Sequence, residues 1–229
     1  MNGIALSQQM LDSNRDVWDA MQSHRFVQDI AADELPSEVF ARYLLFEYGF
    51  VETAICIFGH AMLKAPGFAQ RRWLIGVMWA LAEEQVGSFE AAFAALGITR
   101  SEHDAPVPEA VRAFQGGMLT VAATGSYQDI LSIMLAAEWM YAAWCSQVDA
   151  TRISSPELKR WVAMHAAHEF AAQVDRLRSE LDAIGEITDA AERNRLIGLF
   201  RHALLLEIDF HEAVYDASWP VRRAREIMP

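Results

Sequence analysis

Apolar residues recur along the chain at intervals of three and four, which is the period of an α-helix buried on one side. Seven segments show this period, and most are separated by proline, glycine or short polar stretches. They cover residues 7–32, 37–63, 69–96, 109–122, 127–147, 156–184 and 189–217. No run of four or more residues alternates between apolar and polar, so no strand is expected. The pattern predicts an all-α bundle formed by one domain over residues 1–229.

Several residues mark where the predicted helices begin and end. Pro36 precedes the second segment, and Ser155-Pro156-Glu157 is typical of an N-cap followed by proline in the first helical position. Gly185 indicates the end of the sixth helix. The stretch 98–108, with two prolines, predicts the longest loop.

Four glutamates interrupt the apolar stripes of four different segments: Glu47, Glu84, Glu138 and Glu207. Their neighbours at helical spacing are Tyr43, Phe50 and Ala54; Val77, Ala80 and Ala91; Met134, Tyr141 and Cys145; and Phe200, Ala203, Leu204, Phe210 and Val214. A desolvated carboxylate costs several kcal/mol unless it is paired, hydrogen-bonded or protonated. We therefore expect a shared polar cavity inside the bundle. For any one glutamate, a local ion pair or a position at the edge of the buried face is the alternative.

Aromatic side chains accompany three of these glutamates. Tyr43, Phe50, Tyr141 and Phe210 are ordinary core residues by type, and they would also form stacking walls for a flat ligand.

Composition and charge exclude some classes of function. Apolar residues make up 53% of the 229 residues, which excludes a disordered chain. The net charge of −12 argues against nucleic acid as a partner, because phosphate binding depends on clustered cations. The basic run Arg222–Arg225 beside Glu226 is interpreted as a solvated tail.

Two cysteines, Cys56 and Cys145, are too few for a disulfide framework, so a reducing cytoplasm is expected. The first ten residues show no export signal. The longest uncharged stretch, 113–128, is shorter than the roughly 20 apolar residues that a membrane span needs. These features predict a soluble protein with no membrane partner.

A metal site is an alternative use of the same residues. His165 and His168 are three apart and Glu207 precedes His211 by four, but the second, third and fifth segments have no Glu-x-x-His motif. A metal-dependent oxidase would use Glu138, His165 and His168, with Glu84 as a further candidate ligand. We favour no metal and no cofactor, with His60, His165 and His168 as neutral structural or site-lining residues. The sequence also has no G-x-S-x-G elbow, Walker motif or G-x-G-x-x-G loop.

The stretch Tyr43–Phe50, YLLFEYGF, resembles the motif Y-L-x-Q-D-Y-x-Y/F of the TenA/thiaminase II family of aminopyrimidine hydrolases. That family has the all-α heme-oxygenase-like fold, and the similarity extends over nearly the whole chain. Further matching stretches are His24–Val27, Leu35–Phe40, Trp139–Tyr141, Trp161 with Phe170, and Glu207–His211 against the family's E-x-x-F-W.

The chain departs from the family pattern at several positions. Ala137 stands four residues before Tyr141, where the larger branch of the family has its nucleophilic cysteine, and Glu138 follows it. The chain is therefore similar to the branch in which a nearby glutamate substitutes for that cysteine. Phe114 and His165 fall roughly where the family has two active-site tyrosines, and Glu47 falls on its pyrimidine-binding aspartate.

The resemblance implies a thiamine-salvage hydrolase acting on an aminomethyl- or formylaminomethyl-pyrimidine. Glu207 and Glu47 are expected to hold and protonate the pyrimidine, and Glu138 to act as general base on water. The expected substrate-binding residues are Phe50, Tyr141, Phe114, His165, Glu84 and Phe210. A non-catalytic pyrimidine-binding or regulatory protein is a second alternative, beside the metal-dependent oxidase.

A homo-oligomer is also expected. Segment 156–184 has two apolar faces: one has Phe170, Val174, Leu177 and Leu181, and the other has Trp161, His165, His168 and Ala172. Two such faces exceed what one bundle core needs, so one of them would line the site or meet another subunit. The resemblance implies a tetramer, and a dimer is also compatible with the pattern.

Overall fold

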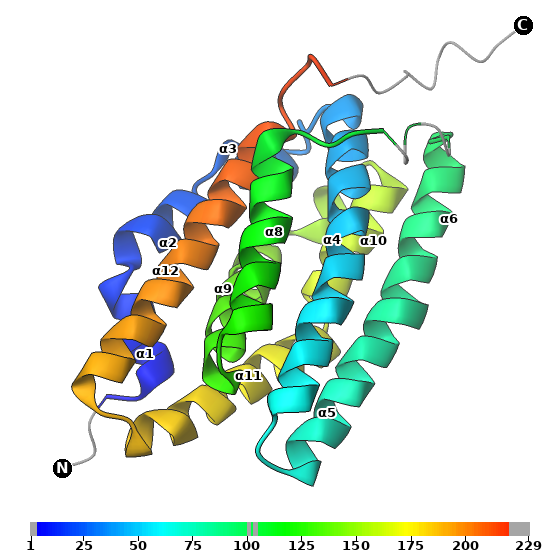
Figure 1. Ribbon diagram of the computed structural model, residues 1–229. Helices are drawn as coiled ribbons and strands as arrows, with labels where there is room; N and C mark the ends of the chain where they lie inside the picture. Colours follow the sequence, from blue (N-terminus) through cyan, green and yellow to red (C-terminus); the bar gives the residue numbers. More distant parts are fainter. Residues whose placement is uncertain (1–3, 100–101, 103–104, 220–229) are drawn as a thin grey trace, which may run out of the picture. The chain divides into compact units, whose positions relative to one another are not determined.

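A computed structural model describes residues 4–99, 102 and 105–219 of the chain. Within these ranges all regular structure is helical and no strand occurs, as predicted (Figure 1). The elements are α1 (Leu6–Ser13), α2 (Arg15–Gln22), α3 (Arg25–Ala32), α4 (Ser37–Lys64), α5 (Phe68–Trp79), the π-helical η1 (Ala80–Gln85), α6 (Val86–Leu96), α8 (Glu109–Thr124), α9 (Tyr127–Cys145), the 3-10 turn η2 (Ala150–Arg152), α10 (Pro156–His165), α11 (His168–Ile187) and α12 (Ala190–Ala213).

The contacts between Cα atoms divide the chain into two compact units, each made of two stretches of sequence. Unit 1 contains residues 1–33 and 125–208, and unit 2 contains residues 34–124 and 209–229. Helix α12 begins in unit 1, and its last residues are counted with unit 2. The single domain over residues 1–229 stays a prediction.

Unit 1 is organised around α9, which contacts α2, α10 and α11. Most residues of α9 are buried, including Ile130, Met134 and Met140. A capping box starts this helix: the Ser126 hydroxyl accepts from the Asp129 amide, and the Asp129 carboxylate accepts from the Ser126 amide.

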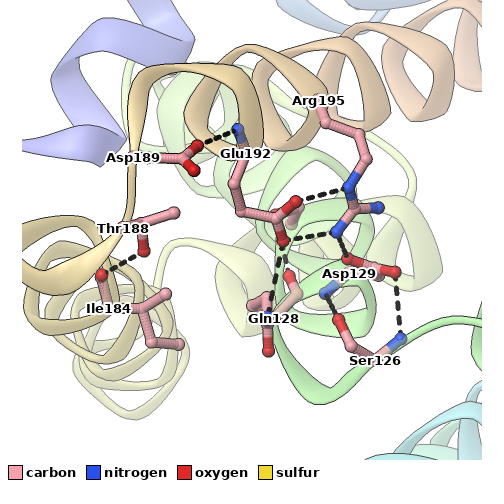
Figure 2. Close-up of polar contacts among 9 residues, drawn as sticks. Ser126, Gln128, Asp129, Ile184, Thr188, Asp189, Glu192 and Arg195 are labelled. Atoms are coloured by element: carbon pink, nitrogen blue, oxygen red, sulfur yellow. Dashed lines mark hydrogen bonds and ion pairs between the residues drawn. The ribbon is translucent and has the colours of Figure 1, made fainter.

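Helix α12 is attached to the start of α9 by a polar cluster (Figure 2). Arg195 donates to Asp129 Oδ1 over 2.5 Å and to both carboxylate oxygens of Glu192. Asp189 accepts from the Glu192 amide and so caps the first turn of α12. The network fixes the α9 and α12 ends that precede Glu138 and Glu207.

Unit 2 is organised around α4, which contacts α5, η1, α6 and α8. This helix is long and apolar enough to cross a membrane, but 56% of its most apolar window is buried inside the structure. A core helix of a soluble protein meets the same criterion, so the feature is weak evidence for a membrane span.

The predicted helix at 69–96 forms, but with a change of helix type in its middle. Helices α5 and α6 are joined without a break through the π-helical segment η1 (Figure 1). A π-helix has more residues per turn than an α-helix, so residues beyond it are rotated relative to the regular period.

The predicted helix at 7–32 is wrong as one element, because it is three short helices. The buried Asn14 separates α1 from α2, and its side-chain amide donates to the carbonyl oxygens of Met10 and Ile197. An asparagine that hydrogen-bonds nearby backbone competes with helix formation. His24 starts α3 by accepting from the Phe26 amide.

The predicted helix at 156–184 is also divided. Its start is confirmed, since the Ser155 hydroxyl accepts from the Leu158 amide with Pro156 in the first turn. Helix α10 then ends at His165, and α11 begins at His168.

The end predicted at Gly185 is wrong, because α11 continues to Ile187. A Cβ at Gly185 would lie 2.6 Å from Leu6 Cβ, so the glycine permits close packing of α1 on α11.

Two predicted features fall partly or wholly outside the described residues. The loop at 98–108 is described only in part, and the basic run Arg222–Arg225 lies beyond residue 219.

Candidate functional site

Glu138 is held on the face of α9 that also has Tyr141. The residue as a whole is partly exposed, but its Oε2 is enclosed and has no hydrogen-bond partner among the described residues. Desolvation raises the pKa of Glu138 to about 8, and a hydrogen bond with Gln173 of α11 opposes this rise. Glu138 is therefore a mostly protonated carboxyl group at neutral pH.

His165 lies at the end of α10 and is buried. Its Nδ1 is 2.9 Å from the Trp161 carbonyl oxygen, which can only accept a hydrogen bond. Desolvation lowers the pKa of His165 to about 4, against the effect of this hydrogen bond. The ring is neutral at pH 7, with its proton on Nδ1 and Nε2 left as an acceptor.

Aromatic side chains surround this histidine in unit 1. Tyr141 lies 5.1 Å from His165 between ring centroids, Trp161 lies 4.2 Å away and Phe170 lies 4.9 Å away. The structure thus brings together two predicted site residues, Tyr141 and His165.

Glu207 lies on α12 with only 1% of its side chain exposed, and both carboxylate oxygens are enclosed. Ala203 and Leu204, one helical turn earlier, are also buried. The predicted burial of Glu207 on an apolar stripe is confirmed.

In unit 2, Glu47 is buried on α4, and its Oε2 has no hydrogen-bond partner among the residues that the structure describes. Desolvation raises the pKa of Glu47 to about 8, and a hydrogen bond from Tyr43 opposes this rise. The predicted burial of this glutamate is confirmed, and its side chain is a proton donor at pH 7.

Phe50, Phe114 and Phe210 form an aromatic cluster in unit 2. The rings of Phe50 and Phe114 are stacked with centroids 4.3 Å apart, and Phe114 lies 5.1 Å from Phe210. Phe210 also contacts Tyr43, the partner of Glu47. Three predicted substrate-binding residues therefore lie in contact with one another, and one of them touches the tyrosine that supports Glu47.

The predicted burial of Glu84 is wrong. Glu84 is exposed, and it lies in η1, where the wider π-helical turn changes the phase of the stripe that includes Val77 and Ala80. The structure gives no support to Glu84 as a substrate-binding residue.

The metal alternative finds little support in the side-chain positions. His168 is exposed while His165 is buried, so the two histidines do not share an environment. Among the described residues no three His, Cys, Asp or Glu side chains lie together as a ligand group.

Cys145 does not have the environment of a nucleophile. Cys145 is buried, and desolvation raises the pKa of its thiol well above the ordinary value, while Cys56 is exposed on α4. Ala137, beside Glu138, is buried on α9.

Two polar residues of the site were not predicted from the sequence as functional. Tyr43 was interpreted as a core residue or a stacking wall and not as a hydrogen-bond partner, although its spacing of four from Glu47 already allows the hydrogen bond. Gln173 was missed altogether, and the one signal was an amide three residues after Phe170 on the same helix face.

Comparison with known proteins extends over both units. An aminopyrimidine aminohydrolase from Halalkalibacterium halodurans is 23% identical over 216 residues, which cover 93% of this chain and 96% of that protein. The structure of a TenA homologue from Pyrococcus furiosus superposes with a TM-score of 0.84 at 21% identity, covering 92% of this chain and 100% of the other. A domain from Shewanella denitrificans with a heme oxygenase-like fold superposes with a TM-score of 0.73 at 14% identity, covering 94% of each chain.

The predicted all-α, heme-oxygenase-like fold is therefore confirmed. The sequence profile of one family, described as TENA/THI-4/PQQC, matches residues 11–217, which is most of the chain. The resemblance inferred from the motifs around Glu47 and Glu207 is confirmed, and the chain belongs to the TENA/THI-4/PQQC family.

Proposed function

We propose that this protein is a thiamine-salvage hydrolase that acts on the aminomethyl or formylaminomethyl group of an aminopyrimidine. The observation that carries the proposal is the pair of enclosed carboxyl groups, Glu47 and Glu138, each with a pKa raised to about 8. The name of the Halalkalibacterium relative, an aminopyrimidine aminohydrolase, gives the same class of reaction.

An aminopyrimidine presents a ring nitrogen beside an exocyclic amine. A protonated carboxyl group matches this edge, because it donates to the ring nitrogen and accepts from the amine. When the proton passes to the ring, the pair becomes charge-assisted and about twice as strong as a neutral pair. Glu47, supported by Tyr43, has the protonation state that this contact requires at pH 7.

Protonation of the ring also makes the aminomethyl carbon attached to it more electrophilic. Water then adds its oxygen to this methylene carbon, the bond from that carbon to its amine breaks, and ammonia leaves with the proton that water gives up, while the ring amine stays in place. We assign the general base for this water to Glu138, because its Oε2 is enclosed and accepts no hydrogen bond from a described residue. At pH 7 about one tenth of a group with a pKa near 8 is deprotonated, which suffices for a base near its working pH.

Glu207 is assigned to contact with the pyrimidine, because Glu207–His211 matches the family's E-x-x-F-W. Its side chain is enclosed on α12, three residues before Phe210. Phe50, Phe114 and Phe210 supply apolar ring faces, and Tyr141 and the neutral His165 supply further ones. Ala137 and the buried Cys145 give no thiolate nucleophile, so direct attack by water takes the place of a covalent intermediate.

The test is turnover of aminomethyl- and formylaminomethyl-pyrimidine by the purified protein, measured as release of ammonia or formate. Glu138→Gln is expected to lower kcat by about 100-fold or more, as is typical when a general base is removed. Glu207→Gln removes a carboxyl group that holds the pyrimidine and is expected to lower kcat/KM. Glu52→Gln, on the exposed side of α4, is the matched control and should leave kcat unchanged. Unchanged turnover in both site variants would overturn the assignment of roles.

The pH profile distinguishes the two carboxyl groups. If Glu138 acts as a base and Glu47 as an acid, kcat/KM is bell-shaped with both limbs in the neutral to weakly basic range. Glu138→Gln should remove the rising limb from the residual activity. A profile that keeps both limbs in this variant would assign the base to another group.

We further propose that the protein works in the cytoplasm. Cys56 and Cys145 are both free thiols, which a reducing compartment preserves. Fractionation of the source cells, with the protein followed by an antibody, tests this location.

A further inference from the structure

Trp219 lies after the end of α12 and joins three segments of unit 2. Its side chain is only 8% exposed. The indole Nε1 donates a hydrogen bond to the carbonyl oxygen of Pro106 over 2.7 Å. The indole ring also meets the ring of Phe46 on α4 edge-on, with centroids 4.9 Å apart. One tryptophan therefore fastens the loop before α8 to α4.

The segment that contains this tryptophan, residues 214–219, is attached to α4 at a second point. Arg42 of α4 is buried, and its Nε donates to the carbonyl oxygen of Val214 over 2.6 Å. Phe46, the partner of the Trp219 ring, follows Arg42 by four residues on the same helix. The segment is thus held at both of its ends along α4, which keeps Trp219 in place.

The loop that Trp219 holds leads directly into α8, which contains Phe114. Pro106 lies three residues before Glu109, the first residue of α8, and Phe114 lies in the second turn of that helix. Helices α4 and α8 run side by side in unit 2 (Figure 1). A contact that fastens the start of α8 to α4 therefore limits how far Phe114 can move from Phe50.

Of these two helices, α8 is the one expected to move. Helix α4 is at the centre of unit 2 and packs against α5, η1, α6 and α8, whereas α8 packs mainly on α4. Pro106 in the loop before α8 is exposed, so burial does not hold this part of the loop. The hydrogen bond from Trp219 supplies a hold that burial does not.

The spacing of Phe50 and Phe114 leaves no room for a ligand between them. Their rings are stacked with centroids 4.3 Å apart and an angle of 29° between the planes. Carbon atoms in contact lie about 3.5 Å apart, so a flat ring held between two others needs about 7 Å between their centroids. The two rings must therefore separate by about 3 Å before a pyrimidine can stack on both.

We propose that Trp219 is a positioning residue of the pyrimidine site, and that its hold on the start of α8 keeps Phe114 stacked on Phe50 until a ligand separates the two rings. Trp219 acts through Pro106 and α8 rather than by contact with the ligand. The identity of the ligand rests on the proposed function, whereas the fastening of α8 does not. A ligand that binds only the separated rings loses affinity in proportion to the fraction of protein already separated. Weakening the hold of Trp219 should therefore strengthen ligand binding.

The test removes the hydrogen-bond donor and keeps the ring. Trp219→Phe retains an aromatic ring against Phe46 but has no N–H to donate to Pro106. The probe is the hydroxymethyl-pyrimidine that the proposed reaction releases, because it binds without being consumed. Isothermal titration calorimetry of the full chain should give a Kd about 3- to 10-fold lower for the variant than for wild type, the range expected for one net hydrogen bond. The melting temperature of the variant should be lower, because a native contact is lost.

Trp18→Phe is the matched control for this substitution. Trp18 is 6% exposed, close to the 8% of Trp219, and it packs in unit 1 against Trp139 and Phe200. The same replacement there should also lower the melting temperature, but it should leave the Kd unchanged. A residue with a purely structural role would not make the protein less stable and the ligand more tightly bound. An unchanged or higher Kd in Trp219→Phe would overturn the proposal.

Hydrogen exchange tests the fastening of α8 without a ligand. Amides in residues 109–116 should exchange faster in Trp219→Phe than in wild type, whereas amides of α9 should not change. Equal exchange rates in α8 would overturn the proposal, whatever the Kd values are. If neither protein binds the pyrimidine while exchange in α8 still rises, the proposed function is wrong and the fastening by Trp219 is supported.

Discussion

The ring Nδ1 of His165 and the carbonyl oxygen of Trp161 lie 2.9 Å apart, one helical turn from each other in α10. Because a carbonyl oxygen only accepts, this contact fixes the proton of the neutral ring on Nδ1. The aromatic neighbours Tyr141 and Phe170 offer no charge to stabilise an imidazolium. His165 is thus a neutral side chain whose Nε2 can accept a hydrogen bond from a ligand.

His165 should remain neutral well below the ordinary pH of histidine titration. Its pKa is lowered to about 4 by desolvation, so the folded protein lacks a proton that the unfolded chain binds below about pH 6.5. Folding stability should therefore fall as the pH drops from about 6.5 to about 4, by up to about 1.4 kcal/mol per unit. Nitrogen-15 NMR of labelled histidine, with His165→Gln for assignment, would contradict this if the His165 ring titrates near pH 6.5.

The raised pKa of Glu47 predicts that stability changes with pH in the direction opposite to that expected for His165. Its pKa is raised from 4.5 to about 8, so the folded protein keeps a proton that the unfolded chain releases. The stabilisation is complete below pH 4.5 and is lost as the pH rises through 8. Glu47→Gln cannot ionise, and its stability relative to wild type should grow by about 1.4 kcal/mol per unit between these limits.

Urea unfolding of Glu47→Gln and wild type at several pH values measures this change. Glu52→Gln, which replaces an exposed carboxylate on the same helix, is the control and should show no such trend. A stability difference that is independent of pH would show that the carboxyl group of Glu47 is ionised in the folded protein.

The ends of a helix were predicted correctly where proline or glycine residues and the apolar period indicated the same positions. The helix at 37–63 was predicted within one residue of α4, because Pro36 starts it and Ala65-Pro66-Gly67 follows it. The helices at 7–32 and 156–184 were predicted too long. In 7–32 the breaks coincide with side-chain contacts to backbone at Asn14 and His24. The hydrogen bond from Asn14 to Ile197 joins residues far apart in sequence, and no local pattern reveals it.

The sequence predicted the part of the candidate site that consists of glutamates on apolar helix faces, because a glutamate at such a position is expected to be buried. Glu47 and Glu207 are buried and Glu138 has an enclosed oxygen, as expected. Glu84 was placed wrongly because η1 is π-helical, and a fixed period of 3.6 residues does not apply through such a segment. Gln173 was not predicted, because no sequence spacing distinguishes a single functional glutamine from other glutamines.

The basis for expecting an oligomer also changes with the structure. The two apolar faces assigned to 156–184 belong to two helices, and Trp161, His165, Val174, Leu177 and Leu181 are all buried in the chain. Three large exposed apolar side chains, Phe68, Ile75 and Trp79, lie on α5, and others lie elsewhere in the described chain, at Ile4, Leu63, Ile187 and Leu205.

The ion pair between Asp129 and Arg195 predicts a modest loss of stability when the arginine is removed. Burial raises the pKa of Asp129, but hydrogen bonds from Arg195 and Ser126 outweigh it, and the net pKa is lowered. Arg195→Gln should destabilise the fold by about 1 kcal/mol, a value reduced for the partial exposure of Arg195. The loss should vanish at acid pH, where Asp129 is protonated.

Chemical denaturation at pH 7 and pH 3 measures both effects. Arg160→Gln is the matched control, because Arg160 pairs with Glu157 on the surface of α10 and its removal should cost less than about 0.5 kcal/mol. Equal costs for the two arginines would show that the cluster in Figure 2 adds nothing beyond a surface pair.

The close approach of Gly185 to Leu6 predicts the effect of a single added methyl group. A Cβ at Gly185 would lie 2.6 Å from Leu6 Cβ and 3.3 Å from Leu6 Cδ2, so α1 must move away from α11 to admit it. The nearest atom is a Cβ, which cannot turn aside by a change of rotamer. Gly185→Ala should therefore destabilise the protein by about 1–3 kcal/mol, the usual cost of overpacking.

Gly198→Ala provides the opposite case in a helix of the same unit. Gly198 lies within α12, and a Cβ there would meet no atom within 4 Å. Alanine should stabilise the helix at that position by about 0.5–1 kcal/mol, because glycine loses more backbone entropy on folding. Thermal unfolding of both variants should shift Tm in opposite directions. A gain in Tm for Gly185→Ala would mean that α1 does not pack closely on α11.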